Sequence, residues 1–522
     1  MTFRLTYATM FNPPEAMHER FEVAMATVRA GLGGRHGLFI DGADRDPSHH
    51  AARVSPIDSD LHLGDFALAS AADVEAAMAA AQAAFPAWRA TPVAERARLV
   101  RRVGDVMEER VYEIAAALTL EVGKNRMEAL GESQETVDFF RHYADDFERA
   151  GGYDRVLPDD PLDGINSHNR SAMRPYGVWA VIAPFNFPLA LAGGPAAAAL
   201  VTGNTVVVKC ASDTPWAGRL LADSVRDAGL PPGVFNYLSG SGVDVGAAMV
   251  SDPRTAGITF TGSVPVGMEL VRTMAGGTYP RPCIAEMGGK NACIVTADAD
   301  LDRAATGIVR SAYGMGGQKC SALSRLYVDE TVADALIDKL QQQIAAIRIG
   351  DPCKREYWLG PVVNRRAYDA YAAYVAQLLD EGASFLAGGR QLTDDELARG
   401  YYVEPVLAEA PVSHPLWKHE MFLPVLMLHR VSGRDEAMRL ANDSDMGLTA
   451  GIYGSEADVA WFHDNIEAGV TYANRAQGAT TGAWPGYQPF GGWKGSGSTG
   501  KAIASFYYLA QYMREQSRTV VE

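Results

Sequence analysis

Strand-like and helix-like patterns alternate along much of this chain, and that alternation restricts the fold more than any other feature. From residue 177 onward, short apolar runs such as 205–210 and 257–260 alternate with stretches of helical periodicity. A second alternating region runs from about 290 to 470. Such alternation predicts a mostly parallel sheet with helices on both faces, so the fold class is α/β.

The segment before residue 150 is mostly helical in pattern. Ser70 and Asp73 form a capping box that opens an alanine-rich helix, and Thr91-Pro92 supplies a cap and a first-turn proline for the next helix. We expect these helices to be scaffold, with the first one an amphipathic arm packed on the main body. The predicted helices cover 13–32, 70–85, 93–120 and 125–148.

Two segments look different from this alternating body. Residues 151–176 are polar and irregular, which predicts a hairpin that leaves the main body. Residues 507–521 alternate enough to form a terminal strand that could add to the sheet of another subunit. At 522 residues, the chain is long enough for two to four domains.

A cysteine stands in a glycine-rich turn at 314–322, with strand-like segments on both sides. Glycines allow close approach of the backbone to a ligand, so this turn exposes a thiol. Most single cysteines are inert, buried apolar residues. Here Glu286, on a second glycine turn at 286–290, changes the interpretation. A carboxylate near a thiol nucleophile can activate the water that attacks an acyl product.

Two further polar residues follow predicted strands. Asn186 lies directly after the strand at 178–183, where its amide can donate to a developing oxyanion; the plain alternative is a turn residue that satisfies its own backbone. Lys209 ends the next strand, and a lysine at the carboxyl end of a parallel strand points into the crevice where cofactors bind. A surface salt bridge is the ordinary alternative for this lysine.

Three glycine patterns are candidates for a phosphate-binding loop. The pattern at 240–246, which includes Gly242, follows a strand and opens a helix, but its last spacing is not that of a dinucleotide fingerprint. The pattern at 495–500 matches GxGxxG literally but follows no apolar strand, so we reject it. In the stretch 259–263, with Gly267 beyond it, a strand ends and a helix begins. The free amides of that helix start can bind phosphate.

Charge and composition exclude several classes of function. The net charge of −16 argues against a nucleic-acid surface. The five cysteines show no CxxC pair or disulfide spacing, which fits a reducing, cytoplasmic setting, and the eleven histidines form no metal-binding pattern, so no metal is expected. The longest apolar run, 177–201, contains one asparagine and three prolines, which predicts strand, turn and buried helix rather than a membrane span.

Over roughly residues 35 to 522, the chain resembles the aldehyde dehydrogenase superfamily. The matching blocks are PFNFP (184–188), VVVK (206–209), FTGS (260–263), EMGGK (286–290), GQKCS (317–321), the Glu420/Phe422 block and QPFGG (488–492). Within the superfamily it looks most like the L-glutamate γ-semialdehyde (1-pyrroline-5-carboxylate) dehydrogenases, because of the N-terminal arm, QKCSALSR at 318–325 and TGAWPGYQPFGG at 481–492.

The resemblance implies a role for each matching residue. Cys320 would be the nucleophile, Glu286 the general base and Asn186 the oxyanion donor. The residues implied for cofactor binding are Lys209, Ser212, Gly242, Thr261, Gly262, Ser263, Glu420 and Phe422. Those implied for substrate binding are Phe185, Ser321, Gly482 and Ala483. The cofactor would be NAD or NADP, since Ser212 replaces the usual ribose-binding carboxylate while Asp213 lies beside it.

The family also implies a domain arrangement. A Rossmann-type NAD(P)-binding domain would comprise 1–150, with its N-terminal helical arm, and 177–287. An α/β catalytic domain would follow at 288–480. A small β oligomerisation unit would combine the hairpin at 151–176 with the C-terminal strand in 500–522. The family is typically dimeric or higher, so a homodimer or larger homo-oligomer is expected.

The expected reaction is oxidation of an aldehyde to a carboxylic acid through a cysteine thiohemiacetal and thioester, with glutamate γ-semialdehyde as substrate and glutamate as product. Three alternatives stay open. Trp484-Pro485 gives the substrate loop an aromatic wall that could serve a bulkier or aromatic aldehyde. A CoA-acylating enzyme would transfer the acyl group to CoA, although Glu286 favours hydrolysis. A catalytically silent binding protein would not need Cys320, Glu286 and Asn186 together.

Overall fold

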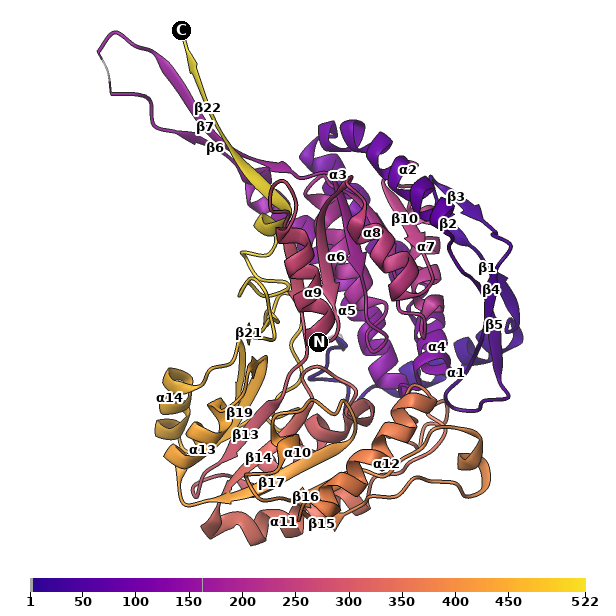
Figure 1. Ribbon diagram of the computed structural model, residues 1–522, viewed down its shortest axis with the longest axis vertical. Helices are drawn as coiled ribbons and strands as arrows, with labels where there is room; N and C mark the ends of the chain where they lie inside the picture. Colours follow the sequence, from indigo (N-terminus) through magenta and orange to yellow (C-terminus); the bar gives the residue numbers. More distant parts are fainter. Residues whose placement is uncertain (1–2, 162) are drawn as a thin grey trace.

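Two seven-stranded sheets, each covered by helices, make up most of the molecule (Figure 1). The computed structural model describes residues 3–161 and 163–522. The first sheet lies in the upper part of the view and the second, built from residues 291–473, in the lower part. The predicted α/β class is confirmed.

The first sheet has the order β12-β11-β8-β9-β10-β2-β3. The first five strands in this order are parallel, and β2 and β3 add an antiparallel edge. The chain runs from β8 through β9 to β10 in one direction and then returns to place β11 on the other side of β8. Ligands bind outside the carboxyl ends of strands at such a switch point. The strands are β2 (Leu38–Ile40), β3 (Ala43–Arg45), β8 (Val178–Ile182), β9 (Thr205–Lys209), β10 (Phe235–Leu238), β11 (Thr255–Thr261) and β12 (Cys283–Glu286).

The second sheet has the order β15-β16-β17-β14-β13-β19-β20, and all of its strands except β15 are parallel. Successive residues of its strands join different cores: Leu326 and Val328 pack on one face, and Tyr327 packs on the other. This burial on both faces explains the continuous apolar runs. The strands are β13 (Asn291–Val295), β14 (Leu323–Asp329), β15 (Ser384–Ala387), β16 (Val406–Glu409), β17 (Val425–Val431), β19 (Thr449–Tyr453) and β20 (Val470–Ala473).

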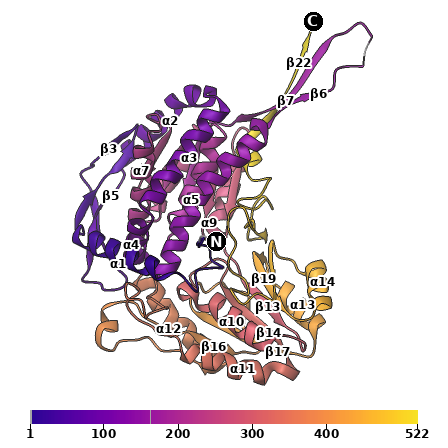
Figure 2. The same cartoon turned by 180° about the vertical axis from the view of Figure 1, so that it is seen from behind.

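Helices cover both faces of the two sheets (Figures 1 and 2). In the first sheet Val206 and Val208 join the core that includes α6, and Val207 joins the core that includes α2. The helices are α1 (Glu15–Ala30), α2 (Ala71–Ala90), α3 (Val93–Glu109), α4 (Val111–Val122), α5 (Arg126–Arg149), α6 (Ala190–Val201), α7 (Pro215–Ala228), α8 (Ala247–Ser251), α9 (Val264–Ala275), α10 (Leu301–Tyr313), α11 (Glu330–Ala345), α12 (Arg365–Asp380), α13 (Arg434–Asn442) and α14 (Glu456–Asn465).

Two predicted helix boundaries in this region were wrong. Helix α2 does not end near Phe85 but continues through Pro86, although proline lacks an N–H group. Trp88 is buried there and donates its indole N–H to the carbonyl of Leu200 (3.0 Å), so packing sustains the last turn. The helix predicted over 93–120 is interrupted at Arg110, whose ψ of 12° separates α3 from α4.

The capping box at Ser70 and Asp73 is present, but the cap predicted at Thr91 is absent. Thr91 donates its hydroxyl backward to the carbonyl of Ala87 (3.1 Å) instead of capping α3. The Thr214 hydroxyl has no partner among the described residues. The first N–H groups of α7 are instead bound by the buried carboxylate of Glu121, which accepts bonds of 2.7 and 3.0 Å. A carboxylate from another helix thus replaces the local cap.

Glu132 of α5 plays the same part for α6. Its carboxylate accepts the N–H groups of Leu189 (2.8 Å) and Ala190 (3.2 Å) and forms a salt bridge with Lys124, whose side chain is fully buried. Burial lowers the pKa of Lys124, while the Glu132 carboxylate opposes that shift. Glu132 therefore ties α5 to the start of α6 and to the connection between α4 and α5.

Replacing Glu132 by glutamine is expected to destabilise the protein by about 3–5 kcal/mol, because it leaves the buried ammonium of Lys124 without its carboxylate. Thermal and chemical unfolding would measure the loss. The exposed Glu113, on the neighbouring helix α4, offers a matched Glu113→Gln control. Equal unfolding midpoints for the two variants would contradict the assigned role.

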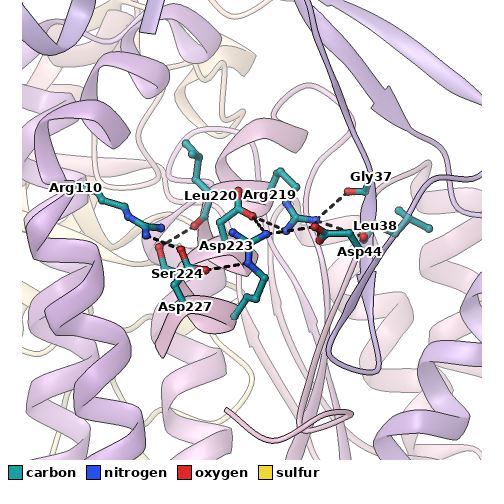
Figure 3. A network of polar contacts seen from close by, with 10 residues as sticks. Gly37, Leu38, Asp44, Arg110, Arg219, Leu220, Asp223, Ser224 and Asp227 are labelled. Atoms are coloured by element: carbon teal, nitrogen blue, oxygen red, sulfur yellow. Dashed lines mark hydrogen bonds and ion pairs between the residues drawn. The ribbon is translucent and has the colours of Figure 1, made fainter. Parts of the chain in front are cut away.

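A polar network fastens the antiparallel edge of the first sheet to α7 (Figure 3). The buried Arg219 pairs with Asp44 (2.9 Å) and donates to the carbonyl of Gly37 (3.4 Å). At the other end of the network, Arg110 pairs with Asp227 (2.5 Å). The break between α3 and α4 is therefore anchored on the same helix that holds β2 and β3.

A three-stranded sheet projects from the body (Figures 1 and 2). The hairpin of β6 (Asp154–Leu157) and β7 (Ser167–Pro175) pairs with the C-terminal strand β22 (Met513–Val521). The terminal strand thus begins later than the predicted residue 507, because Leu509–Tyr512 forms a 3-10 turn that buries Tyr508 and Tyr512. A smaller sheet comprises β1 (Gly34–His36), β5 (His62–Ala67) and β4 (His50–Val54), and β18 (Met446–Gly447) pairs with β21 (Trp493–Lys494).

The apolar run 177–201 forms strand β8, a turn and the buried helix α6, as its prolines and asparagine predicted. A search of residues 3–161 and 163–522 finds no helix both long and apolar enough to cross a membrane.

Candidate active site

The carboxyl edge of the first sheet meets the amino edge of the second. Asn186 follows β8, Lys209 ends β9 and Glu286 ends β12, so all three lie at the first edge. The turn with Cys320 leads into β14, and Glu420 lies before β17, so both lie at the second edge. Parallel strands in each sheet therefore bring together residues that are far apart in the sequence.

The cysteine turn is held by amide side chains. Asn186 donates from Nδ2 to the carbonyl of Gln318 (3.0 Å), and Asn291 donates to the carbonyl of Cys320 (2.7 Å). Cys320 is partly exposed and Asn186 is buried. An amide nitrogen carries two hydrogens, so Asn186 keeps one N–H for a ligand.

The protonation of Cys320 is set by its surroundings. Burial raises the pKa of the Cys320 thiol to about 12, and the carboxylates of Glu420 and Glu286 add to the rise. The backbone N–H groups of Ser321 and Cys320 point toward the sulfur and oppose it. Those two amides suit a developing negative charge at this position.

The surroundings of Glu286 suit a general base. Burial raises the pKa of Glu286 well above its ordinary value, and a bond from the Gly492 N–H opposes the rise. Its Oε2 has no hydrogen-bond partner in the part of the chain that the structure describes. A buried carboxylate oxygen that no protein group satisfies is available to a water molecule.

Glu420 approaches the second glycine turn closely. Its Oε1 accepts the N–H of Gly289 (2.9 Å), and burial raises the pKa of Glu420 to about 7, opposed by that N–H and by Lys290. A Cβ atom at Gly288 would collide with the Glu420 carboxylate, which explains the glycine at that position. Phe422 adopts a left-handed backbone (φ 58°), and its ring lies edge-on to that of Phe185 (5.7 Å between centroids).

Three other residues predicted to bind the cofactor end or follow strands of the first sheet. Lys209 is buried, and burial lowers its pKa while Cys210 and Asp213 oppose the shift. Ser212 donates its hydroxyl to the carbonyl of Gly240 (3.1 Å). Gly242 opens a π-helical turn at Gly242–Gly246. No group of three or more metal-ligating side chains occurs among the residues that the structure describes.

The start of α9 has free polar groups. Ser263 occupies the N-cap position but makes no capping bond to the described helix. The buried Thr261 hydroxyl likewise has no partner within the described ranges. Gly262 donates its N–H to the carbonyl of Glu286 (3.1 Å), which links this helix start to the end of β12. Free hydroxyls and amides at a helix start suit an anionic phosphate.

Alanine at Gly288 is expected to weaken binding of NAD or NADP at least about tenfold, because the added Cβ pushes aside Glu420, and charge-assisted bonds contribute about 1.5–3 kcal/mol each. Fluorescence titration with NADH or NADPH would measure the change. Gly433→Ala is the matched control, because a Cβ there meets open space. Unchanged cofactor affinity in Gly288→Ala would show that Glu420 does not contribute to cofactor binding.

A cavity with several aromatic residues in its wall reaches the thiol. Cys320 and three residues predicted to bind substrate, Ser321, Gly482 and Ala483, line it together. Phe185, which was also predicted to bind substrate, packs on Phe422 and does not line the cavity. Phe187, two residues further along the chain, does line it. The other aromatic walls are Tyr7, Phe11, Phe139, Trp484 and Phe490.

The N-terminal segment 4–11 forms one of these walls, which sequence reasoning did not foresee. Tyr7 packs edge-on against Trp484 (5.1 Å between centroids). The Trp484 indole donates to Asp138 (2.8 Å), and Arg4 pairs with the same carboxylate (3.1 Å). Trp484 is therefore fixed in the wall by contacts on two sides.

Helix α5, expected to be scaffold, also contributes to the cavity. Glu128 pairs with Lys319 (2.7 Å), both buried, and Glu135 accepts the hydroxyl of Tyr7 (2.7 Å). Burial raises the pKa of Glu135 to about 8, while the bond from Tyr7 opposes the rise. Glu128, Glu132 and Glu135 share one face of the helix at spacings of four and three, a signal that the sequence contained.

A comparison with known protein families matches residues 43–517 to the aldehyde dehydrogenase family. The chain belongs to the aldehyde dehydrogenase family. The match covers the whole of the second seven-stranded sheet, every strand of the first except β2, and all the predicted site residues from Phe185 to Ala483, while the N-terminal segment 4–11 lies outside it. The predicted family is confirmed.

Individual relatives confirm the resemblance within the family. The 1-pyrroline-5-carboxylate dehydrogenase of Geobacillus sp. (strain WCH70) is 35% identical over 514 residues, which is 97% of this chain and 97% of that relative. The protein of the same name from Bacillus pumilus (strain SAFR-032) is 36% identical over 515 residues, again with 97% of both chains covered. A solved structure of 1-pyrroline-5-carboxylate dehydrogenase from Thermus with bound NAD is similar to this aldehyde dehydrogenase with a TM-score of 0.92, at 34% identity, covering 100% of this chain and 99% of that chain.

Proposed function

We propose that this aldehyde dehydrogenase oxidises L-glutamate γ-semialdehyde to L-glutamate with NAD or NADP. The observation that carries the proposal is the meeting of Cys320, Glu286 and Asn186 at the junction of the two sheets, beside a cavity lined by Ser321 and Gly482. The similarity to 1-pyrroline-5-carboxylate dehydrogenases over nearly the whole chain supports the substrate.

The residues at the carboxyl edge of the first sheet fit a dinucleotide. The start of α9 offers Ser263 and Thr261 to a pyrophosphate, and Lys209 and Glu420 are suited to hold the two riboses. The close approach of Glu420 to Gly288 supports this assignment, since it leaves the carboxylate where a hydroxyl can reach it. The bound nicotinamide supplies the oxidant that accepts the hydride.

The first chemical step forms a bond between sulfur and carbon. Cys320 attacks the aldehyde carbon as a thiolate, and the carbonyl oxygen becomes an oxyanion. The free N–H of Asn186 and the backbone N–H of Cys320 stabilise that charge, at about 3 kcal/mol for each donor. Departure of hydride from the same carbon leaves a thioester on Cys320.

The second step breaks the thioester with water. Glu286 accepts a proton from a water molecule as that water attacks the acyl carbon, and the C–S bond breaks to release the acid and the Cys320 thiolate. The unsatisfied Oε2 of Glu286 supports this role. Across the cycle, the aldehyde and water become the acid, with one hydride transferred and protons released.

A panel of aldehydes tests the substrate. Glutamate γ-semialdehyde is expected to give the highest kcat/KM of the panel. The absorbance of NADH or NADPH measures the rate for each aldehyde. Because Trp484, Tyr7 and Phe187 give the cavity aromatic walls, benzaldehyde and hexanal belong in the panel. A kcat/KM for either that exceeds the semialdehyde value by orders of magnitude would overturn the substrate assignment. If turnover required CoA, the proposal that water releases the acyl group from Cys320 would be wrong.

We propose that both NAD and NADP are accepted. Ser212 places no charge where the family typically has a carboxylate for the adenosine ribose. The neighbouring Asp213 lies near Arg53 (3.6 Å), which also donates to the Asp213 carbonyl (2.5 Å), so its charge is partly neutralised. Repulsion of a 2′-phosphate is correspondingly reduced. Comparable kcat/KM for the two cofactors is the expected result, and a ratio above a thousand would contradict it.

We propose three functional units: 1–150 with 177–287 for the cofactor, 288–480 for the nucleophile, and 151–176 with 500–522 for assembly into a homodimer or larger oligomer. The projecting sheet supports assembly, because it extends away from the body and its strands carry the exposed residues Val156, Leu157, Val520 and Val521. Deletion of 513–522 is expected to lower the molar mass measured by light scattering. An unchanged mass would contradict the role of β22.

We propose a reducing, cytoplasmic setting. All five cysteines are free thiols in the structure, including Cys320, which must stay reduced to act as the nucleophile. Fractionation of the source cells would test the setting, and recovery of the protein outside the cytoplasm would contradict it.

A further inference from the structure

Arg310, near the end of α10, places a guanidinium in the wall of the cavity that contains Cys320. One nitrogen donates to the carbonyl of Ala476 (3.1 Å). The guanidinium carbon lies 3.7 Å from the centre of the Phe11 ring, so the planar group is stacked on the N-terminal segment. These two contacts fix the orientation of Arg310 while leaving other N–H groups for a ligand.

The charge of Arg310 is uncompensated. It forms no ion pair with any residue in the described ranges 3–161 and 163–522. The other charged groups of the cavity are matched: Lys319 pairs with Glu128 (2.7 Å), and the pKa of Glu135, raised to about 8 by burial, keeps that carboxyl mostly protonated at neutral pH. Burial also lowers the pKa of Arg310, which reflects the cost of keeping a cation here without an anion.

The position of Arg310 is coupled to the substrate loop and to the nucleophile. The adjacent residue, Ser311, is bonded to Thr481 (3.1 Å) and accepts the backbone N–H of Thr480 (3.1 Å). Thr480 in turn donates its hydroxyl to the carbonyl of Ser321 (2.7 Å). One chain of hydrogen bonds therefore links the end of α10 to the loop with Gly482 and to the residue after Cys320.

We propose that Arg310 binds the carboxylate of the substrate and thereby selects aldehydes that carry one. The inference rests on the proposed oxidation of a carboxylated aldehyde, and it adds a full charge to a subsite otherwise made of the Ser321 hydroxyl and the Gly482 and Ala483 amides. A guanidinium matches a carboxylate with two parallel N–H donors. Phe11 is a positioning residue that holds this fork by stacking.

The test compares two aldehydes of the same chain length, glutamate γ-semialdehyde and pentanal, with Arg310→Gln. The KM for the semialdehyde is expected to rise about 10–100-fold, as for loss of a hydrogen bond to a charged group, while kcat/KM for pentanal stays within about twofold. Arg303→Gln is the matched control, since Arg303 carries the same charge on the exposed face of the same helix. If the KM for the semialdehyde rose equally in Arg303→Gln, a general electrostatic effect would explain the rise without direct binding by Arg310. That result would overturn the proposal.

A binding measurement separates this role from turnover. Glutarate, titrated into the enzyme by calorimetry, is expected to bind the wild type and to lose about tenfold or more in affinity in Arg310→Gln, with partial recovery in Arg310→Lys. Phe11→Leu should weaken glutarate binding about two- to fivefold, the size of a cation–π contact. Equal glutarate affinity in wild type and Arg310→Gln would overturn the proposal. If wild type oxidises the semialdehyde and Arg310→Gln has an unchanged KM, this inference fails and the proposed function stands; if wild type does not oxidise it, the proposed function fails.

Discussion

Cys320→Ala is expected to abolish aldehyde oxidation, with kcat reduced about 10⁴-fold or more, the scale on which loss of a nucleophile acts in enzymes that use one. Alanine removes the atom that forms the thiohemiacetal and the thioester. The fold should be unaffected, because the turn is held through the carbonyl of Cys320 and through Asn186, not through the sulfur. Steady-state absorbance of NADH or NADPH measures the activity.

A control cysteine and a chemical probe complete this test. Cys283, partly exposed on β12, is not part of the cavity lining, so Cys283→Ala should keep full activity. In the cofactor-free enzyme, alkylation of Cys320 by iodoacetamide should accelerate roughly tenfold per pH unit below pH 10, because its pKa is raised to about 12. Activity in Cys320→Ala close to that of the wild type would eliminate the covalent mechanism.

Glu286→Gln is expected to separate the two halves of the reaction. Glutamine keeps the shape of the side chain but cannot accept a proton from water, so hydrolysis should slow about 10²–10⁴-fold. Hydride transfer does not need this base. Stopped-flow absorbance should therefore show a burst of about one reduced cofactor per active site, followed by a slow steady state, and mass spectrometry should detect the acyl group on Cys320.

The pH dependence gives this variant a second signature. Because burial raises the pKa of Glu286 well above its ordinary value, the carboxyl is protonated and inactive below that pKa and becomes a base above it. Hydrolysis in the wild type should therefore rise with pH, and Glu286→Gln should lose that rise. The exposed Glu269, on α9, provides the control Glu269→Gln. If Glu286→Gln showed no burst and kept the pH profile of the wild type, another residue would have to be the general base.

The sequence predicted the sheets well because their strands are buried on both faces. Runs such as Val206–Val208 have no polar residue to interrupt them, and Lys209 ends that strand with a polar group. Since parallel strands end at one edge, the convergence of Asn186, Lys209 and Glu286 could be predicted from the order of elements alone. The glycine turns marked the same edge.

Residues that act through long-range packing could not be predicted in this way. The continuation of α2 through Pro86 depends on the burial of Trp88, which local propensity does not reveal. Glu128 and Glu135 lie on one face of α5, but whether that face meets solvent or a cavity depends on the placement of other segments. Tyr7 was missed because it lies in irregular structure, where no period marks the buried side.

The contact between Tyr7 and Trp484 has a consequence for biosynthesis. At roughly 5–20 residues per second, Trp484 leaves the ribosome about half a minute to a minute and a half after Tyr7. During that time the aromatic residues of segment 4–11 have no native partner in the substrate loop and are available to chaperones or to neighbouring nascent chains. Completion of the cavity is therefore a late, post-translational event, and translation speed or chaperone supply should affect the yield of active enzyme more than the yield of folded sheets.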